Sequence, residues 1–429
     1  MNLPEKFLHR MKERLGTDYP AFLSSYENPP CKGLRVNTLK ISKEEFLKIS
    51  PFPLAGIPWE ENGFYIQEEK AGGYVEHFAG LYYLQEPSAM SVGNVTKSLK
   101  KERVLDLCAA PGGKTTLVAA QMQGEGVLIA NEIDKARAKI LSQNVERMGV
   151  KNCAVISAAP DRLSRQFPEY FDLILVDAPC SGEGMFKKEV NAVPEWSEEN
   201  VKRCAERQSG ILDEAAKMLS GGGAIVYSTC TFAEEEDEWQ VRAFLERHPA
   251  FKLEEEEKYY PHKVKGEGHY CALLKKTEGG AWGSKPYPVM RNAQANKAFS
   301  AFAEDFLQTP LKGEITTLPD GRMYLLPMGM PLIDAYVLRL GVELGEWDGK
   351  LFKPAHALAM ALGTYAKRKV KLPREEAEKY LRGETVEAEI ENGWCAVCFE
   401  EYPLGLAKAV NGTLKNHLPK GLRKVKSVK

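Results

Sequence analysis

The stretch that most constrains this chain is RVLDLCAAPGGKT, residues 103–115. A short apolar run at 104–107 ends in small residues and a Pro-Gly-Gly turn, and an amphipathic stretch follows. This order predicts a strand, a tight loop and a helix. The glycines let the backbone approach a ligand closely, and the start of the helix presents free N–H groups to that ligand.

A second apolar run, residues 127–130, ends at Asn131-Glu132. An acid at this strand end is where a nucleotide-binding βαβ unit holds a ribose by its hydroxyls. An NAD site is disfavoured because Gly-x-Gly-x-x-Gly is absent, and a phosphate loop would need glycine where the chain has Cys108. S-adenosylmethionine (SAM) has a ribose and no phosphates, so it stays compatible. A plain α/β turn without a ligand is the remaining alternative.

Length and composition set broad limits on the chain. Its 429 residues predict two to four domains, and no apolar run approaches the roughly 18 residues of a membrane span. The first residues lack an apolar signal core, so we expect a cytoplasmic protein with no membrane partner. The nine cysteines are then expected to be reduced thiols. Cys395-x-x-Cys398 has no second pair or histidine nearby, so no metal site is predicted.

Strand-like and helix-like segments alternate from residue 101 to about 276. This alternation predicts a parallel sheet with helices on both faces, and ligands gather at the carboxyl ends of such strands. Further strands are expected at 153–156, 171–176, 223–227 and 269–274. Helices are expected at 3–15, at 43–49 after Ser42, from Asp134 (with Ala136, Ile140, Leu141, Val145 and Met148 on one face), from Ser197, and over 232–247.

Two strand ends carry residues of chemical interest. The fourth strand runs into Asp177-Ala178-Pro179-Cys180, and the fifth runs into Ser228-Thr229-Cys230. The glycine loop, an acid and two thiols are therefore expected at one edge of the sheet. Cys230 is predicted to lie at a helix start, where backbone dipoles lower the pKa of a thiol.

A thiolate beside SAM suggests methylation of a poor carbon nucleophile such as carbon 5 of cytosine. Cysteine is the best nucleophile available near neutral pH. Its addition to carbon 6 would make carbon 5 reactive toward the methyl group, and an acid near the ring nitrogen N3 would stabilise the adduct. Asp177 is the candidate for that acid.

The chain resembles the Nol/Nop/Sun family of RNA cytosine-5 methyltransferases, and most closely its bacterial branch acting on small-subunit ribosomal RNA. The resemblance covers nearly the whole chain, and the paired DAPCSGEG and STCT motifs are its most specific part. The matching segments are RVNTLK (35–40), LQEPSAM (84–90), LDLCAAPGGKT (105–115), NEID (131–134), LVDAPCSGEGMFKK (175–188), YSTCTFAEEE (227–236), GEGHYCALLKK (266–276) and PLGLAKAVNGTLKNHLPKGLR (403–423).

The resemblance implies a role for each matching residue. Cys230 would be the nucleophile, and Cys180 would assist breakdown of the covalent adduct. Asp177 would touch both the cofactor and the target base. The family's usual acid near the adenine falls on Ala159 here, and Asp161 is out of register, so that contact is not assigned. SAM would be held by Cys108, Ala109, Ala110, Pro111, Gly112, Gly113, Lys114, Glu132 and Asp177.

The resemblance also implies the architecture: a Rossmann-like SAM-dependent methyltransferase with a small N-terminal α+β domain and a C-terminal PUA-like, β-rich RNA-binding domain. The expected partner is RNA, either ribosomal RNA or a small-subunit particle, and the expected state is a monomer. Residues 402–429 hold seven Lys or Arg and no acid, which favours RNA contact over a merely solvated tail. The expected boundaries are 1–100 (N-terminal), 101–278 (catalytic), 279–345 (linking) and 346–429 (PUA-like).

Several alternatives remain open at this point. One is methylation of tRNA in place of ribosomal RNA, and another is a non-catalytic SAM-binding ribosome assembly factor. A DNA cytosine-5 methyltransferase would use Cys180 as nucleophile, but its Glu-Asn-Val motif would lie at a later strand end, whereas residues 199–201 open a helix. An ATPase is disfavoured by Cys108.

Overall fold

The computed structural model describes residues 2–189 and 191–424, and its central sheet is built from the predicted alternating segments. The sheet has the order β10-β11-β9-β8-β5-β6-β7-β14. Its strands are β5 (Arg103–Asp106), β6 (Val127–Asn131), β7 (Cys153–Ser157), β8 (Phe171–Asp177), β9 (Leu219–Thr229), β10 (Phe251–Tyr259), β11 (His269–Lys276) and β14 (Tyr336–Leu340). Strands β5 to β9 run parallel, and β11 and β14 run antiparallel to them. The edge strand β10 pairs antiparallel with β11 and so runs in the same direction as β5 to β9. The predicted parallel sheet is confirmed.

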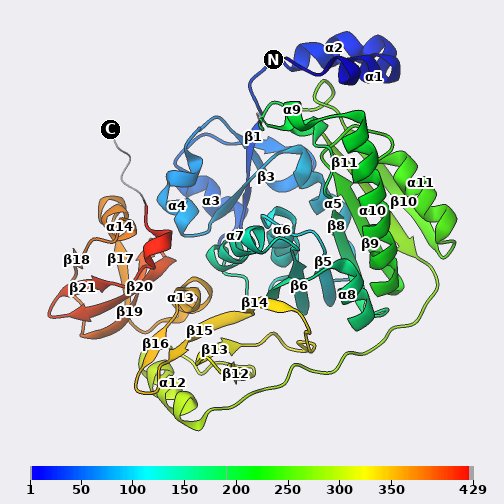
Figure 1. The fold of residues 1–429 in the computed structure, drawn as a ribbon. Helices are drawn as coiled ribbons and strands as arrows, with labels where there is room; N and C mark the ends of the chain where they lie inside the picture. The colour runs from blue at the N-terminus through cyan, green and yellow to red at the C-terminus, as the bar shows by residue number, and fades with distance from the viewer. Residues whose placement is uncertain (1, 190, 425–429) are drawn as a thin grey trace.

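Helices cover both faces of this sheet (Figure 1). Val104 packs with the helices of one face and Leu105 with those of the other, as alternate residues of a strand do. Burial on both faces explains why these strands are continuous apolar runs. One face carries α5 (Val92–Thr96), α6 (Gly113–Met122) and α7 (Lys135–Arg147), and the other α8 (Pro160–Gln166), α10 (Glu198–Met218) and α11 (Glu238–Arg247).

The predicted helix starts at Ser42, Asp134 and Ser197 are confirmed by side-chain caps. Asp134 Oδ1 accepts hydrogen bonds from the N–H groups of residues 136 and 137 at 2.8 and 2.9 Å. Ser42 forms a capping box with Glu45 at the start of α3 (Lys43–Ile49), and Ser197 caps α10. These starts were predictable because a cap needs only a short polar side chain at the right place.

The predicted buried face of α7 is wrong in part. Leu141 and Val145 are buried, but Ile140 is 49% exposed and Ala136 is also exposed. Ala138 lies on the buried face instead. The reason is geometric: Ala138 is three residues before Leu141 and so lies over it, whereas Ile140 is turned about 100° away.

The chain beyond β11 returns to the central sheet. It runs along the outside of the molecule (Figure 1) to α12 (Ala293–Phe306) and then supplies β14, which pairs with β7. Arg339 of β14 is buried and bonds to Glu146 of α7. The segment 279–345, predicted only as a linking region, thus supplies a strand to the catalytic sheet. The domain boundaries themselves stay a prediction. A small sheet of order β12-β13-β15-β16 lies beside it: β12 (Ile315–Thr317), β13 (Arg322–Leu325), β15 (Val342–Trp347) and β16 (Phe352–Pro354).

The N-terminal segment forms an antiparallel sheet of order β2-β3-β1-β4. Tyr82 and Tyr83 are buried, so these two rings belong to the hydrophobic core. The strands and helices of this segment are α1 (Glu5–Leu15), α2 (Tyr19–Ser25), β1 (Lys32–Val36), α3, β2 (Ala55–Ile57), β3 (Glu60–Ile66), α4 (Val75–Phe78) and β4 (Tyr82–Gln85).

The C-terminal segment forms a sheet of order β17-β19-β20-β21-β18. Cys395 and Cys398 are fully buried in two different apolar clusters, and the described residues hold no group of side chains arranged to bind a metal ion. Residues 425–429 of the predicted basic end lie outside the described residues. The elements are α13 (His356–Leu362), β17 (Lys369–Leu372), α14 (Arg374–Leu381), β18 (Val386–Glu387), β19 (Gly393–Phe399), β20 (Tyr402–Val410) and β21 (Thr413–Asn416).

Short 3-10 turns and one further helix complete the described chain. No helix in this part of the chain is both long and apolar enough to cross a membrane. The turns are η1 (Gly16–Asp18), η2 (Ala71–Gly73), η3 (Ser88–Ser91), η4 (Glu183–Met185), η5 (Gly363–Tyr365) and η6 (Lys420–Leu422), and the helix is α9 (Ala192–Glu195).

Asn37 joins the N-terminal sheet to the catalytic domain, and its removal should destabilise the protein. The fully buried amide donates to the carbonyl oxygens of Gly80 (2.8 Å) and Met148 (2.9 Å). Asn37→Ala leaves both buried acceptors unpaired, so we expect a loss of about 2–4 kcal/mol in the free energy of unfolding, measured with denaturant. The exposed Asn94→Ala is the control and should change it by less than about 0.5 kcal/mol. Equal effects of the two variants would contradict this role for Asn37.

Candidate active site

The glycine loop joins β5 to α6 at the point where the strand order reverses. Chain order proceeds from β5 to β6 and β7 on one side and to β8 and β9 on the other, and ligands bind at such a switch point. Gly112 has φ 111°, and a Cβ there would lie 3.1 Å from Leu141 Cδ1. Any larger residue would therefore both strain the backbone and press on α7.

Arg35 of β1 supports this loop from the N-terminal domain. Its Nη2 donates to the carbonyl oxygen of Gly113 and to Thr116 Oγ1, both at 3.0 Å. Burial lowers the pKa of the guanidinium to about 10, so it stays charged near neutral pH. Sequence reasoning did not assign Arg35; its only signal was the RVNTLK segment in which it lies.

Asp106, the last residue of β5, is a second residue that sequence reasoning missed. It is fully buried, and burial raises the pKa of its carboxyl to about 7. Oδ2 accepts a hydrogen bond from Thr115 Oγ1 at 2.6 Å, whereas Oδ1 accepts none from the described residues. A buried acceptor without a hydrogen-bond partner beside the glycine loop is suited to a ligand that carries a hydrogen-bond donor, such as the amino group of SAM.

Glu132 lies at the end of β6, the strand next to the glycine loop. Its Oε1 accepts from the Asp134 N–H at 3.0 Å, and its Oε2 lies 3.4 Å from Arg137 Nη1. Arg137 Nη2 also donates to the carbonyl oxygen of Ala110 at 2.9 Å. Arg137 therefore bridges the predicted ribose-binding acid and the glycine loop. The residues predicted to hold SAM come together at this edge of the sheet.

The end of β7 carries no acid, and Ala159 stands where the resemblance places the family's usual acid. Ala158 and Ala159 follow the strand, and the Ala158 N–H donates to Asn131 Oδ1 at 2.9 Å. Asp161 lies in the first turn of α8 and pairs with Arg165 at 3.0 Å. The usual adenine contact of the family is therefore missing from this position.

The two cysteines meet at the ends of β8 and β9. Cys180 Sγ and Cys230 Sγ are 3.2 Å apart, and both are free thiols. The hydrogen bond to Cys230 and burial raise the pKa of the Cys180 thiol, which disfavours Cys180 as the thiolate. Lys187, a possible source of positive charge near Cys180, is paired with Glu267 at 3.1 Å.

The prediction that Cys230 lies at a helix start is wrong. Helix α11 begins only at Glu238, and residues 231–237 form a loop and a turn. The reason is that Glu236 and Asp237, within the expected helix 232–247, turn inward and are fully buried. Thr229 Oγ1 donates to Asp237 Oδ1 at 2.6 Å, and Lys258 pairs with Asp237 at 2.8 Å.

Glu236 connects the two cysteine loops. Its Oε2 accepts from the Ser181 N–H and from Gln208 Nε2, each at 2.9 Å. The hydroxyls of Ser181 and Thr231 are 2.8 Å apart, which adds a second link between the residues that follow Cys180 and Cys230. The sulfur–sulfur distance therefore depends on a buried carboxyl, whose pKa burial raises to about 8.

Asp177 and Lys114 form an ion pair between the glycine loop and the cysteines. Lys114 Nζ lies 2.7 Å from Asp177 Oδ1, and Ser228 Oγ donates to the same oxygen at 3.1 Å. Burial alone would lower the pKa of Lys114, but the charge of Asp177 and its hydrogen bond outweigh burial and raise it. The paired Lys114 ammonium therefore lies close enough to Cys230 for their charges to interact.

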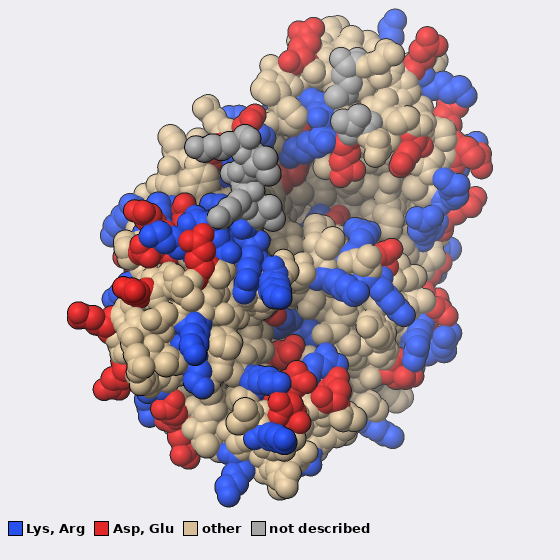
Figure 2. Space-filling model, turned by 60° about the vertical axis from the view of Figure 1, so that its left-hand side comes forward, with Lys and Arg blue, Asp and Glu red and all other residues tan. Residues whose placement is uncertain are grey.

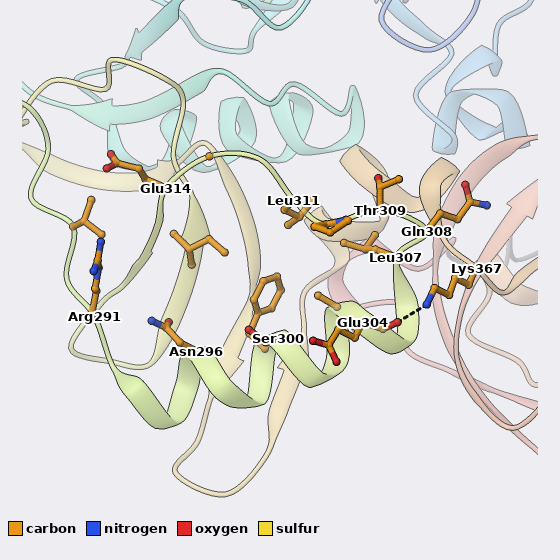
Figure 3. A pocket seen from close by; sticks show the side chains of 16 residues that line it. Arg291, Asn296, Ser300, Glu304, Leu307, Gln308, Thr309, Leu311, Glu314 and Lys367 are labelled. Atoms are coloured by element: carbon orange, nitrogen blue, oxygen red, sulfur yellow. Dashed lines mark hydrogen bonds between the residues drawn. The ribbon is translucent and has the colours of Figure 1, made fainter.

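A pocket of about 660 Å³ lies elsewhere, between α12 and the loop that leads to β12 (Figure 3). Its wall includes Phe299, Leu307 and Leu311, and Lys367 Nζ donates to the carbonyl oxygen of Glu304 at 2.6 Å. None of the predicted site residues lines this pocket.

Glu236 should make the stability of the protein fall as pH rises. A carboxyl whose pKa is about 8 when folded and near 4.3 when unfolded is protonated mainly in the folded state between these values. Raising the pH from 5 to 8.5 therefore removes stability. The glutamine of Glu236→Gln cannot titrate. Over this pH range the variant should therefore lose roughly 2–4 kcal/mol less of its free energy of unfolding than the wild type loses, as measured by denaturant titrations.

The matched control for this pH dependence is Glu234→Gln. Glu234 belongs to the same turn, but its side chain is 42% exposed and pairs with Arg14 at 3.1 Å. Its variant should keep the pH dependence of the wild type. Identical profiles for Glu236→Gln and the wild type would contradict a buried, protonated Glu236.

Family models match almost the entire chain. The model described as 16S rRNA methyltransferase RsmB/F matches residues 95–275, and that for the N-terminal domain of 16S rRNA methyltransferase RsmF matches 3–87. The RsmF first C-terminal domain matches 301–362, and the RsmF PUA domain matches 367–424. The predicted N-terminal, Rossmann-like and PUA-like parts of the fold are confirmed.

Whole-chain relatives and solved structures agree with these matches. Ribosomal RNA small subunit methyltransferase F of Erwinia tasmaniensis is 32% identical, and that of Escherichia coli O17:K52:H18 is 33% identical; each alignment spans 98% of this chain and 96% of the relative. A methyltransferase homolog from Pyrococcus horikoshii is 27% identical, with a TM-score of 0.55 over 64% of this chain and 100% of that one. NSun6 from the same organism, solved with SFG, is 22% identical and shares the fold, with a TM-score of 0.57 over 64% and 98% of the two chains.

These findings confirm the predicted branch of the Nol/Nop/Sun family, and membership of a methyltransferase family supports SAM as the cofactor. The chain belongs to the RsmB/F family of bacterial 16S ribosomal RNA methyltransferases.

Proposed function

We propose that the protein methylates carbon 5 of a cytosine in small-subunit ribosomal RNA, with SAM as methyl donor and a covalent Cys230–cytosine adduct as intermediate. The observation that carries this proposal is the pair of thiols 3.2 Å apart, Cys180 and Cys230, beside the Lys114–Asp177 ion pair. The names of the whole-chain relatives favour ribosomal RNA over tRNA, and the intact thiol pair disfavours a non-catalytic assembly factor.

Cys230 begins the reaction as a thiolate that adds to carbon 6 of the ring, forming the S–C6 bond and sending the C5=C6 electrons into the ring. The Lys114 ammonium stabilises the negative charge that develops there, and Asp177 hydrogen-bonds the N3 side of the ring. Carbon 5 then takes the methyl group that SAM supplies. A water molecule then takes the carbon 5 proton, the C–H electrons restore the C5=C6 double bond, and the S–C6 bond breaks to release the Cys230 thiolate.

Cys180 assists this last step. It lies within hydrogen-bonding distance of Cys230 Sγ, and hence of the bond that must break. Glu236 acts through the Cys180 loop and does not touch the ring, so it is a positioning residue. Such an arrangement separates the attacking thiol from the thiol that helps release the product.

SAM is held by the glycine loop, residues 108–114, together with Glu132 and Asp177. Glu132 takes the ribose hydroxyls, and Asp106 Oδ1 offers the free acceptor described above. Because Arg137 pairs with Glu132 and with the loop carbonyl of Ala110, it orients both for the cofactor.

RNA contact is supported by the charge distribution. Lys408 and Lys415 lie directly opposite each other on β20 and β21, and both are exposed. Two like charges at opposed positions repel each other, and an anionic partner such as a phosphate group would relieve that repulsion. Figure 2 shows Lys and Arg side chains gathered below a central hollow, interspersed with some acids. Such surfaces attract the phosphate backbone of RNA.

The expected substrate can be tested directly. Labelled methyl transfer should occur to 16S ribosomal RNA or the small-subunit particle, and to neither tRNA nor DNA. Transfer to DNA alone, or absence of transfer to every substrate with SAM bound, would contradict the proposal.

Glu132→Ala should weaken SAM binding by roughly 1.5–3 kcal/mol, measured by calorimetry, because a charged hydrogen-bond acceptor is lost. The exposed Glu125→Ala on the loop before β6 is the control and should bind SAM as the wild type does. Unchanged affinity of the Glu132 variant would remove Glu132 from the cofactor site.

The roles of the two cysteines can be separated by single substitutions. Cys230→Ala should abolish turnover and any covalent RNA adduct, because no attacking thiolate remains. Cys180→Ala should still attack and transfer the methyl group but stall before elimination, so a protein–RNA adduct should accumulate on a denaturing gel. Adduct with Cys230→Ala and none with Cys180→Ala would mean that the roles are reversed.

A further inference from the structure

Two exposed apolar side chains from distant parts of the chain lie at the outer end of the cofactor site. Ile133 follows Glu132 and is 64% exposed, and Tyr336 begins β14 and is 52% exposed. Tyr336 pairs with Ser157 at the end of β7, and Ser157 Oγ donates to the carbonyl oxygen of Ile133 at 3.0 Å. One residue, Ser157, therefore connects the two positions.

The segment that carries Tyr336 is held firmly against α8. Arg162 Nη2 lies 2.8 Å from Asp334 Oδ1. Gln166 accepts from the Asp334 N–H at 3.0 Å and donates to the carbonyl oxygen of Leu332 at 2.6 Å. Lys135, the first residue of α7, holds its Nζ 4.7 Å from the centre of the Tyr336 ring. The ring is thus fixed at the carboxyl edge of the sheet from two sides.

The order of the strands gives the direction in which the cofactor extends. The glycine loop follows β5 and the ribose-binding acid follows β6, so the adenine continues outward to the end of β7 and the start of the antiparallel β14. The end of β7 offers Ala158 and Ala159, which leave room but supply no carboxylate. An aromatic ring at the next strand end can contact a flat purine in place of the missing acid.

We infer that Tyr336 forms the outer wall of the adenine site, opposite Ile133, so that the C-terminal part of the chain completes the SAM site. This inference rests on the proposed SAM site at Glu132. It explains why β14 is joined to the catalytic sheet by Arg339 and Glu146, since movement of β14 would remove one wall of the site.

Calorimetry with S-adenosylhomocysteine tests the inference. Tyr336→Ala should raise the Kd about 5- to 20-fold, Tyr336→Gln should do likewise, and Tyr336→Phe should retain binding because the ring makes the contact. With RNA as substrate, Tyr336→Ala should raise KM for SAM and leave kcat nearly unchanged at saturation. Tyr365→Ala is the matched control: Tyr365 is 50% exposed and has Lys151 Nζ 5.3 Å from its ring centre.

The possible outcomes distinguish a failure of the Tyr336 inference from a failure of the proposed SAM-dependent function. Normal affinity in both Tyr336→Ala and Tyr336→Gln, with weak binding by Glu132→Ala, would overturn the role of Tyr336 and leave the SAM site intact. No binding of S-adenosylhomocysteine by the wild type would overturn the proposed function itself. Equal losses in the Tyr336 and Tyr365 variants would overturn the inference, because a general destabilisation would then explain both.

Discussion

Parallel pairing of β5 to β9 is the constraint on which the rest of the structure depends. Parallel strands bring all their carboxyl ends to one edge, so loops far apart in sequence meet there. The glycine loop follows β5, Cys180 follows β8 and Cys230 follows β9. Burial of alternate residues on both faces fixes the register, since a shift by one residue would exchange the faces that Val104 and Leu105 pack against.

The chemistry at this edge depends on charges that are costly to bury. Asp106, Glu236 and Asp237 are fully buried acids whose pKa values burial raises to about 7, 8 and 7. Each is compensated by hydrogen bonds or by a cation, as Lys258 does for Asp237. Three buried carboxyl groups in one site reduce the stability of the fold. Such groups are typical of functional sites, where chemistry is maintained at a cost in stability.

Local signals were enough to predict β5 to β9 and β11, the caps at Ser42, Asp134 and Ser197, and the meeting of the glycine loop with both cysteines, whereas the acid-rich β10 was not predicted. The start of α11 was not predictable in this way, because the acids before it are drawn toward Ser181 and Lys258, which are distant in sequence. The pairing of β14 with β7 and the contact of Arg35 with the glycine loop were missed for the same reason: both join segments that carry no matching local pattern.

The site also draws on the first helix of the chain. Arg10 and Arg14 of α1 pair with Glu235 and Glu234, on the turn that follows Cys230, at 2.5 and 3.1 Å. These pairs neutralise the exposed acids of that turn, while Glu236 and Asp237 point inward. The run of acids after Cys230 is thus divided between an outer pair matched by α1 and an inner pair matched by buried donors. The N-terminal segment therefore holds the turn that follows Cys230 in place, although it lies outside the catalytic sheet.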